Sequence, residues 1–333
     1  MKTIILCEAP QHIPTVYAPV VMNRLQAVTD LDGVCYGKAD VLADPERFAD
    51  TEIIFSTWGM PSFTEEEIRT YLPALKCVFY AAGSVQGFAR PFLNCGVRVF
   101  SAWAANAVPV AEYTVAQIIL AGKDFYCQSR LLSQEDRAAA QTRHGAHFGN
   151  YRKKVGLLGC GMIGSLVAEM LKAYDLEVQA FDPFMSAEKA HRLEVTPCSL
   201  EEIFTSCSVV SNHLANNPQT QRMLTYKHFS SMLLYATFLN TGRGAQVVEE
   251  DLVRALTERP DLTAILDVTH PEPSPAGHPF YSLPNCFMTP HIAGSLGGEV
   301  TRMGEYMADE YEKYAAGKNC RYEVTLQMLE TMA

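Results

Sequence analysis

The feature that most constrains the fold of this chain is the glycine-rich stretch GCGMIG at residues 159–164. An apolar run, Val155–Leu158, precedes it, and an amphipathic run that reaches Tyr174 follows it. A second apolar run, Val178–Phe181, then ends at Asp182. A strand, a glycine turn, a helix, a strand and an acid in this order are typical of a dinucleotide-binding βαβ unit. In this context a glycine turn that binds no nucleotide is the less favoured interpretation.

Each part of this unit has its own physical task. We expect Gly159 to permit the tight turn, Gly161 to let the main chain approach a pyrophosphate, and Gly164 to let the helix pack near the sheet. The start of the helix attracts the phosphates. Asp182 would accept hydrogen bonds from both ribose hydroxyls and repel a 2′-phosphate, so NAD(H) is favoured over NADP(H).

Short apolar runs alternate with amphipathic stretches along the chain, which predicts an α/β fold with parallel sheets and helices on both faces. In the first hundred or so residues the expected strands start at Thr3, Glu52, Cys77 and Val97, and the expected helices cover 15–27, 64–72 and 86–94. Four more strands, VVSNHL, TFLN, AILDV and CFMT, join the two that flank the glycine turn in a sheet of six. The last helix, 298–317, has no further strand to pair with, so it is expected to cross back over the first domain.

Length and composition set the protein class. A chain of 333 residues is too long for one ordinary core, so two domains are expected. The net charge of −10 and the lack of a basic run argue against a nucleic-acid partner, and we see no apolar run of membrane-spanning length. Ten cysteines without a C-x-x-C pair favour free thiols in a reducing cytosol over disulfides or a zinc site. We therefore expect a cytoplasmic protein with no metal.

Two stretches precede the glycine turn. NAVPVAEYTVAQIILAG, from Asn106, predicts a long buried helix with Pro109 in its first turn. Residues 123–154 are polar with interspersed aromatics, which fits either a solvated insertion or an arm that packs on a second subunit. The arm, and with it a homodimer, is favoured because four aromatic side chains would otherwise lack cover: Phe125, Tyr126, Phe148 and Tyr151.

Three polar residues follow short apolar segments late in the chain: Arg243 in LNTGRG, Glu272 in HPEP and His291 in TPHIAGS. An arginine binds a carboxylate bidentately and polarises a carbonyl. A histidine transfers a proton near neutral pH, and a carboxylate behind it fixes its tautomer. These residues suit a redox site for a carboxylate-bearing substrate. The alternatives to a functional role are a surface arginine, a core histidine and a solvated glutamate.

These motifs together resemble those of the D-isomer-specific 2-hydroxyacid dehydrogenases. The resemblance covers nearly the whole chain and is strongest from Asn106 to Ser295, where it rests on ANAVPVAEYT, VGLLGCGMIGSLVA, FDP, HLANNPQTQRML, LNTGRGAQVVEEDLVRAL, LDVTHPEPSPAGHPFYSLPN and TPHIAGS. It implies two Rossmann-like domains with parallel sheets. One is a flavodoxin-like substrate domain, residues 1–105 and 296–333, and the other is a doubly wound NAD-binding domain, residues 106–295, inserted into the first.

The resemblance also implies roles for individual residues. Arg243 resembles the arginine that binds the substrate's carboxylate and carbonyl, His291 the general acid/base and Glu272 its partner. The implied cofactor-binding residues are Gly159, Gly161, Met162, Ile163, Gly164, Asp182, His213, Leu214, Ala215, Thr220, Thr241, Gly242 and Asp267. The implied loop for the substrate carboxylate is Ala82, Gly83, Ser84 and Val85. Asp267 would receive the nicotinamide carboxamide, although an acid there is also a plausible turn cap.

Two departures from the family pattern concern the substrate more than the reaction. Val85 and Gln86 replace a usual Asp-Asn pair, and Ala215 stands where proline is common. The implied function is hydride transfer between NAD(H) and C2 of a small 2-oxo or (R)-2-hydroxy acid. The alternative is an NAD(H)-sensing binding protein, similar to the corepressors that share this fold.

Overall fold

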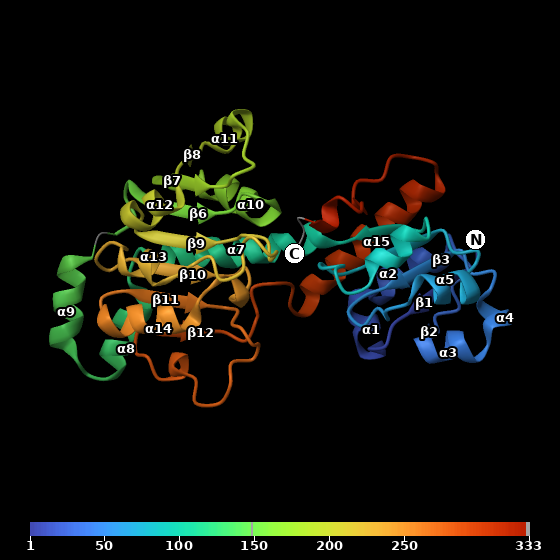
Figure 1. The fold of residues 1–333 in the computed structure, drawn as a ribbon, viewed down its shortest axis with the longest axis horizontal. Coiled ribbons are helices and arrows are strands. Elements are labelled where there is room, and N and C mark those ends of the chain that lie inside the picture. Colours follow the sequence, from blue (N-terminus) through green and yellow to red (C-terminus); the bar gives the residue numbers. More distant parts are fainter. Residues whose placement is uncertain (148, 331–333) are drawn as a thin grey trace. The chain divides into compact units, whose positions relative to one another are not determined.

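The computed structural model describes residues 1–147 and 149–330. It divides into two compact units: an outer unit, Met1–Asn106 with Ser295–Ala333, and an inner unit, Ala107–Gly294 (Figure 1). The outer unit is therefore discontinuous in sequence. Each unit is an α/β layer structure with its own sheet. These sheets confirm the predicted fold class.

The outer unit has a six-stranded sheet in the order β13-β5-β4-β3-β1-β2. Its strands are β1 (Thr3–Leu6), β2 (Cys35–Tyr36), β3 (Ile53–Ser56), β4 (Cys77–Tyr80), β5 (Arg98–Ser101) and β13 (Glu323–Val324). The first five pair in parallel with the flavodoxin-like order 2-1-3-4-5. The expectation that no strand follows the last helix was wrong, because β13 pairs antiparallel with β5. With two residues, β13 is too short to leave an alternating pattern.

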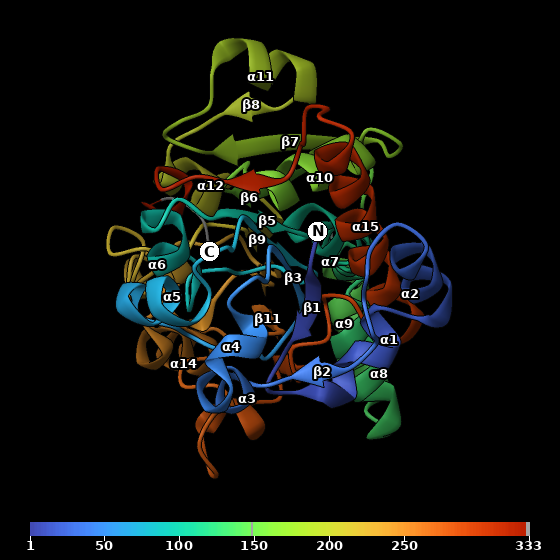
Figure 2. The ribbon, with the colours of Figure 1, turned by 90° about the vertical axis from the view of Figure 1, so that its right-hand side faces the viewer.

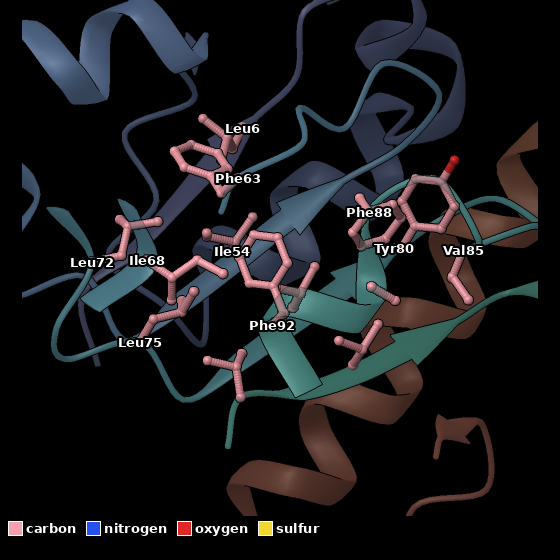
Figure 3. Packing of buried hydrophobic residues seen from close by; sticks show 14 of the residues in the cluster. Leu6, Ile54, Phe63, Ile68, Leu72, Leu75, Tyr80, Val85, Phe88 and Phe92 are labelled. Carbon is pink, nitrogen blue, oxygen red and sulfur yellow. The ribbon is translucent and has the colours of Figure 1, made fainter. Parts of the chain in front are cut away.

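Successive side chains of these strands point alternately into two apolar layers. Leu6 and Ile54 pack with Ile68 and Phe92 on one face (Figure 3), whereas Tyr311 packs on the other. The first face is covered by α3 (Lys38–Ala43), α4 (Pro45–Phe48), α5 (Glu65–Tyr71) and α6 (Ala89–Asn94). The other is covered by α1 (Ile13–Val16), α2 (Pro19–Gln26) and α15 (Thr301–Ala315), and Figure 2 shows α15 beside α2. Both faces of a parallel sheet are thus buried.

The single helix expected over 15–27 is two helices in the structure. Residue Ala18, with φ −52° and ψ 159°, is extended and separates α1 from α2. The residue before a proline is pushed out of the helical region, and Pro19 follows Ala18. The proline therefore ends one helix and starts the next.

The inner unit has a seven-stranded sheet in the order β12-β11-β10-β9-β6-β7-β8. Its strands are β6 (Lys153–Leu158), β7 (Leu176–Phe181), β8 (Thr196–Pro197), β9 (Val209–Asn212), β10 (Thr237–Asn240), β11 (Thr263–Leu266) and β12 (Cys286–Met288). All of these strands pair in parallel, in a doubly wound order. The prediction of six strands missed β8, since it has two residues, one of them a proline, at the sheet edge.

Helices cover both faces of the inner sheet. One face carries α12 (Leu200–Ser206), α13 (Tyr226–Ser230) and α14 (Glu249–Glu258), and the other carries α7 (Trp103–Ala121), α10 (Met162–Leu171) and α11 (Ala187–Leu193). Helix α7 begins three residues earlier than predicted, so Pro109 lies inside it and not in its first turn. Ala105 and Ala107, in the first two turns of the helix, are buried.

The expectation that no apolar run reaches membrane-spanning length was wrong for α7. Its 19 residues are long and apolar enough, by length and composition, to cross a membrane. Ala111, Val115 and Ile118 instead pack into the core of the inner unit with Leu157 and Val167. A core helix between two layers of a globular domain has the same composition.

The polar stretch before the glycine turn forms α8 (Phe125–Ser133) and α9 (Arg137–Ala146). Arg143 donates two hydrogen bonds to the carboxylate of Asp124, at 2.6 and 2.9 Å, in a buried bidentate ion pair that holds the two helices together. Phe125 and Tyr151 are exposed, Tyr126 is half-buried, and Phe148 lies outside the described residues.

A buried carboxylate fixes the C-terminal segment of the outer unit. Glu310 on α15 is fully buried and accepts hydrogen bonds from the main-chain N–H groups of Arg321 (2.6 Å) and Tyr322 (2.9 Å). Its other oxygen accepts one from Lys313 Nζ at 2.7 Å. The two amides lead directly into β13.

Replacement of Glu310 by leucine removes the buried acceptor of both amides. We expect Glu310→Leu to lower the free energy of unfolding by roughly 2–4 kcal/mol, and Glu310→Gln, which keeps an oxygen for the amides, to lower it by less. Urea unfolding of the two variants measures the difference. Equal stability of Glu310→Leu and the natural chain would contradict this role.

Candidate active site

Six of the seven strands of the inner sheet, all but the edge strand β8, end level with one another. Their last residues are register partners across the sheet, in the row Phe181, Leu158, Asn212, Asn240, Leu266 and Met288. The loops that follow these strands therefore meet at the carboxyl edge, which is where open α/β sheets bind ligands. All inner-unit residues predicted for the site lie on these loops or at the start of α10.

The glycine turn has the conformation that a dinucleotide-binding βαβ unit requires. Gly159 has φ +87°, and a methyl group on it would lie 2.9 Å from the carbonyl oxygen of His213. A methyl group on Gly164 would lie 2.0 Å from the carbonyl oxygen of Gly159, so helix α10 can approach the strand only at a glycine. Gly161 faces open space, with no atom within 4 Å of an added methyl group. The turn is thus tightly packed on the protein side and open at Gly161.

Asp182 lies beside this turn and is held by main-chain donors. Its Oδ2 accepts a hydrogen bond from Cys160 N–H and its Oδ1 one from Phe184 N–H, both at 2.9 Å. The N–H groups of Met162 and Ile163, in the first turn of α10, have no partner within the helix. The open space at Gly161 and the N–H groups at the start of α10 fit the pyrophosphate of a dinucleotide, and the anchored carboxylate of Asp182 fits its ribose.

The loop after β9 carries the next predicted cofactor residues. His213 is partly buried, its Nε2 lies 2.9 Å from Ser211 Oγ, and burial lowers its pKa to about 4, so it is neutral at pH 7. Thr220 Oγ1 donates to the carbonyl oxygen of Ala215 at 2.5 Å and closes the turn. The carbonyl of Leu214 accepts a hydrogen bond from Gln246 Nε2 at 2.6 Å. These side chains mainly hold the loop together.

Arg243 follows β10 and is mostly buried. Burial lowers the pKa of its guanidinium, and the nearby charge of Glu272 opposes this shift. Its Nη1 donates to the carbonyl oxygen of Gly242 at 2.8 Å. Across residues 1–147 and 149–330, no carboxylate lies within salt-bridge distance of it. An arginine remains charged at neutral pH. Its remaining N–H groups are therefore available to an anionic ligand.

The loop that carries Arg243, called the arginine loop below, contacts the loop after β11 through Gly244. A methyl group on this residue would lie 2.1 Å from the main-chain carbon of Thr269 and 2.6 Å from the nitrogen of His270. The short helix η2 (Gly244–Gln246) therefore packs directly on the main chain that leads to Glu272. Nothing in the sequence around Gly244 indicates this contact.

His291 and Glu272 form the predicted pair. His291 Nδ1 lies 2.7 Å from Glu272 Oε1, and both side chains are partly exposed. His291 has φ +56°, an uncommon value for a residue with a side chain. Its N–H donates to the carbonyl oxygens of Asp267 and Thr289, each at 3.0 Å, which holds this conformation. With Nδ1 bound to Glu272, Nε2 is the ring nitrogen left for another partner.

Asp267 organises the turn that carries His291. Its buried carboxylate accepts hydrogen bonds from Thr289 Oγ1 (2.6 Å), Ile292 N–H (2.8 Å) and Ala293 N–H (2.9 Å). A carboxylate has about four acceptor sites, so three of them are already used. Thr241 and Gly242 are similarly engaged: Thr241 Oγ1 lies 3.2 Å from Thr114 Oγ1, and Gly242 N–H donates to Asn240 Oδ1.

A pocket of about 330 Å³ lies next to Arg243 and Glu272. Glu249, which the sequence analysis did not single out, lines it as well: its Oε1 accepts from His270 N–H at 2.7 Å. Burial raises the pKa of Glu249. In sequence this residue is one acid in the first turn of a helix, a common arrangement that gives no sign of such a contact.

The predicted carboxylate-binding loop belongs to the outer unit, after β4. Ser101 Oγ donates to the carbonyl oxygens of Ala82 (2.9 Å) and Gly83 (2.7 Å), and Ser84 is exposed. Val85 is buried in the core, and Gln86 Nε2 donates to the carbonyl oxygen of Leu329 at 2.7 Å. The Val85–Gln86 pair therefore anchors the loop to the unit's core and to its C-terminal segment.

Comparison with known proteins places the chain in a family. Residues 115–293 match the family model described as "D-isomer specific 2-hydroxyacid dehydrogenase, NAD binding domain". A D-3-phosphoglycerate dehydrogenase of Archaeoglobus fulgidus is 28% identical over 246 residues, which are 71% of this chain and 44% of the relative. The putative 2-hydroxyacid dehydrogenase YoaD of Bacillus subtilis is 31% identical over 204 residues, 60% of this chain and 58% of the relative. The chain thus spans about half the length of these curated relatives.

The solved structures agree on the fold. The TT0316 protein from Thermus thermophilus matches with a TM-score of 0.71 at 25% identity, over 98% of this chain and all of the other. The family match covers most of the inner unit, whose glycine turn, free amides and Asp182 fit a dinucleotide. This chain belongs to the D-isomer specific 2-hydroxyacid dehydrogenase family, and its inner unit contains that family's NAD-binding domain.

Proposed function

We propose that the chain is an NAD-dependent oxidoreductase that interconverts a small 2-oxo acid and the corresponding (R)-2-hydroxy acid. One observation carries this proposal: the guanidinium of Arg243, which has no carboxylate partner among residues 1–147 and 149–330, lies at the same sheet edge as a histidine that is hydrogen-bonded to a glutamate. A cation for the substrate's carboxylate and a proton donor for its oxygen are what such a reaction requires of the protein.

The inner unit would hold the cofactor along its carboxyl edge. The pyrophosphate would lie at Gly159, Gly161 and Gly164, against the N–H groups of Met162 and Ile163. Asp182 would accept from the adenosine ribose. The cofactor supplies the hydride that is added to C2 of the 2-oxo acid. The family's further contacts, carried over by position, are His213, Leu214, Ala215, Thr220, Thr241, Gly242 and Asp267.

Arg243 would bind the substrate's carboxylate and polarise its carbonyl. Its fixed fork of donors suits two acceptor oxygens, and its burial strengthens the attraction to an anion. Donors aimed at the carbonyl oxygen stabilise the negative charge that develops there as C2 is reduced. The family's loop for the substrate carboxylate, carried over by position, is Ala82, Gly83, Ser84 and Val85.

His291 would transfer the proton. In the direction of reduction, Nε2 gives its proton to the oxygen on C2, and the carbonyl becomes a hydroxyl. Glu272, bound to Nδ1, fixes the ring and stabilises the positive charge of the protonated imidazole. In the direction of oxidation the same nitrogen removes the hydroxyl proton.

Two further proposals concern the molecule's surroundings. The exposed Phe125, Leu132 and Tyr151, on and near α8 and α9, support a second copy of the chain as their cover, and so a homodimer. Ten free cysteines support a reducing compartment such as the cytoplasm.

The reaction is tested by NADH oxidation with a panel of 2-oxo acids whose side chains increase in size. We expect turnover of at least one, and a loss of about 10²- to 10⁴-fold in kcat/KM in both Arg243→Ala and His291→Ala, with NADH binding retained. Arg254→Ala, which removes an exposed arginine on α14, is the control. Near-normal turnover in either site variant would refute the assignment. NADH binding with no turnover of any acid would favour the binding-protein alternative.

The glycine turn gives a prediction that is independent of activity. A methyl group on Gly161 meets no protein atom but occupies the space where a pyrophosphate would lie. We expect Gly161→Ala to keep the thermal midpoint of the natural chain while the dissociation constant for NADH rises about tenfold or more. Gly164→Ala should lose stability as well, since its methyl group collides with Gly159. Unchanged NADH fluorescence titration in Gly161→Ala would place the cofactor elsewhere.

Asp182 should set the preference between the two nicotinamide cofactors. A carboxylate beside the ribose repels a 2′-phosphate, so Asp182→Asn should reduce the ratio of kcat/KM for NADH to that for NADPH by roughly tenfold. Glu188→Gln, which removes an exposed acid on the neighbouring α11, should leave the ratio unchanged. The ratio in Asp182→Asn would stay at its natural value if the ribose lay away from this residue.

A further inference from the structure

Three side-chain amides are buried at the carboxyl ends of β9 and β10. Asn212 and Gln246 are fully inaccessible to solvent and Asn240 is 1% exposed. Asn212 and Asn240 are the last residues of their strands, and Gln246 ends η2, three residues after Arg243. Buried amides must be hydrogen-bonded, because an unpaired one costs folding free energy.

These amides bind both main-chain groups of Arg243. Gln246 Oε1 accepts a hydrogen bond from Arg243 N–H at 3.3 Å, and Asn240 Nδ2 donates to the carbonyl oxygen of Arg243 at 3.2 Å. Asn240 Oδ1 accepts from Gly242 N–H at 3.0 Å. The carbonyl of this same Gly242 accepts from Arg243 Nη1. The contacts therefore extend from the main chain to the guanidinium.

Asn212 connects the two amides that hold Arg243. Its Nδ2 donates to Asn240 Oδ1 at 3.0 Å and to Gln246 Oε1 at 2.5 Å. Gln246 uses its Nε2 to donate to the carbonyl oxygen of Leu214, on the loop after β9. Two neighbouring loops are thus fixed to each other by one glutamine.

We propose that Gln246, supported by Asn212 and Asn240, is a positioning residue that sets the conformation of Arg243 for substrate binding. The proposal rests on the proposed function in so far as Arg243 binds the 2-oxo acid. An apolar residue at 246 could fill the same volume but could not hold the N–H group of Arg243. The guanidinium would then be free to leave the geometry that a bidentate contact with a carboxylate requires.

The test compares Gln246→Leu with the natural chain and with the same change in an Arg243→Ala background. In the natural background we expect kcat/KM for the best 2-oxo acid of the panel to fall about 10- to 100-fold, chiefly through KM. In the Arg243→Ala background the same change should alter kcat/KM by no more than about twofold. A purely structural role would lower activity by the same factor in both backgrounds, and that outcome would overturn the proposal.

Asn285→Leu is the matched control. Asn285 is also a buried amide of the inner unit, and its Nδ2 donates to the carbonyl oxygens of Leu256 (3.1 Å) and Leu262 (2.9 Å), neither of which belongs to the arginine loop. The Asn285→Leu variant should be less stable than the natural chain, but its folded fraction should keep kcat/KM within about twofold. An equal activity loss in Asn285→Leu and Gln246→Leu would also overturn the proposal.

A second variant keeps the test decisive if Gln246→Leu does not fold. The double variant Asn212→Leu/Gln246→Leu removes both members of a buried hydrogen-bonded pair, which is tolerated better than removal of one. It should show the same dependence on Arg243. If Arg243→Ala alone retains normal turnover, the proposed function fails. If Arg243→Ala is inactive but both glutamine variants turn over normally, only the positioning role fails.

Discussion

The candidate site depends on the parallel register of the inner sheet. Asn212, Asn240 and Leu266 are partners in one row, so the loops after β9, β10 and β11 start at the same height. This constraint alone brings residues that are distant in sequence to a common edge. The close approach of Gly244 to Thr269 and His270 then sets the spacing between the arginine loop and the glutamate loop. A side chain at 244 would push these two loops apart.

The loops at the carboxyl edge of the inner sheet are held in place by polar groups whose hydrogen-bonding capacity is almost fully used. Asp267 accepts three hydrogen bonds from the turn that carries His291, and the main chain of His291 is held in a left-handed conformation by two more. Such a conformation persists only where its surroundings fix it. Transfer of a proton to a defined oxygen requires a ring nitrogen in a defined place, so this anchoring is consistent with the proposed role of His291.

The sequence predicted the parts of this molecule that depend on local pattern. The alternation of apolar runs located most strands, and the glycine turn with Asp182 identified the cofactor-binding unit, because these features follow from backbone sterics and strand burial. Two-residue strands such as β8 and β13 leave no such pattern. The amide network was also not visible, since the hydrogen bond between Asn212 and Gln246 joins a strand end and a loop that are 34 residues apart in sequence. Gly244 can be read from the sequence, but the need for glycine at this position comes from the close approach of the Thr269 main chain, which only the structure shows.

The electrostatics of Arg243 explain why the site is built from amides as well as charges. Burial makes a lone guanidinium costly, and Glu272 offsets part of this cost without forming an ion pair with it. A carboxylate in direct contact would stabilise the arginine more but would compete with an anionic substrate. Neutral amides hold the main chain of Arg243, and its guanidinium forms no salt bridge within the described part of the chain. In the proposed reaction, a substrate carboxylate at this site would meet a cation that is already oriented and largely desolvated, so little reorganisation would be needed on binding.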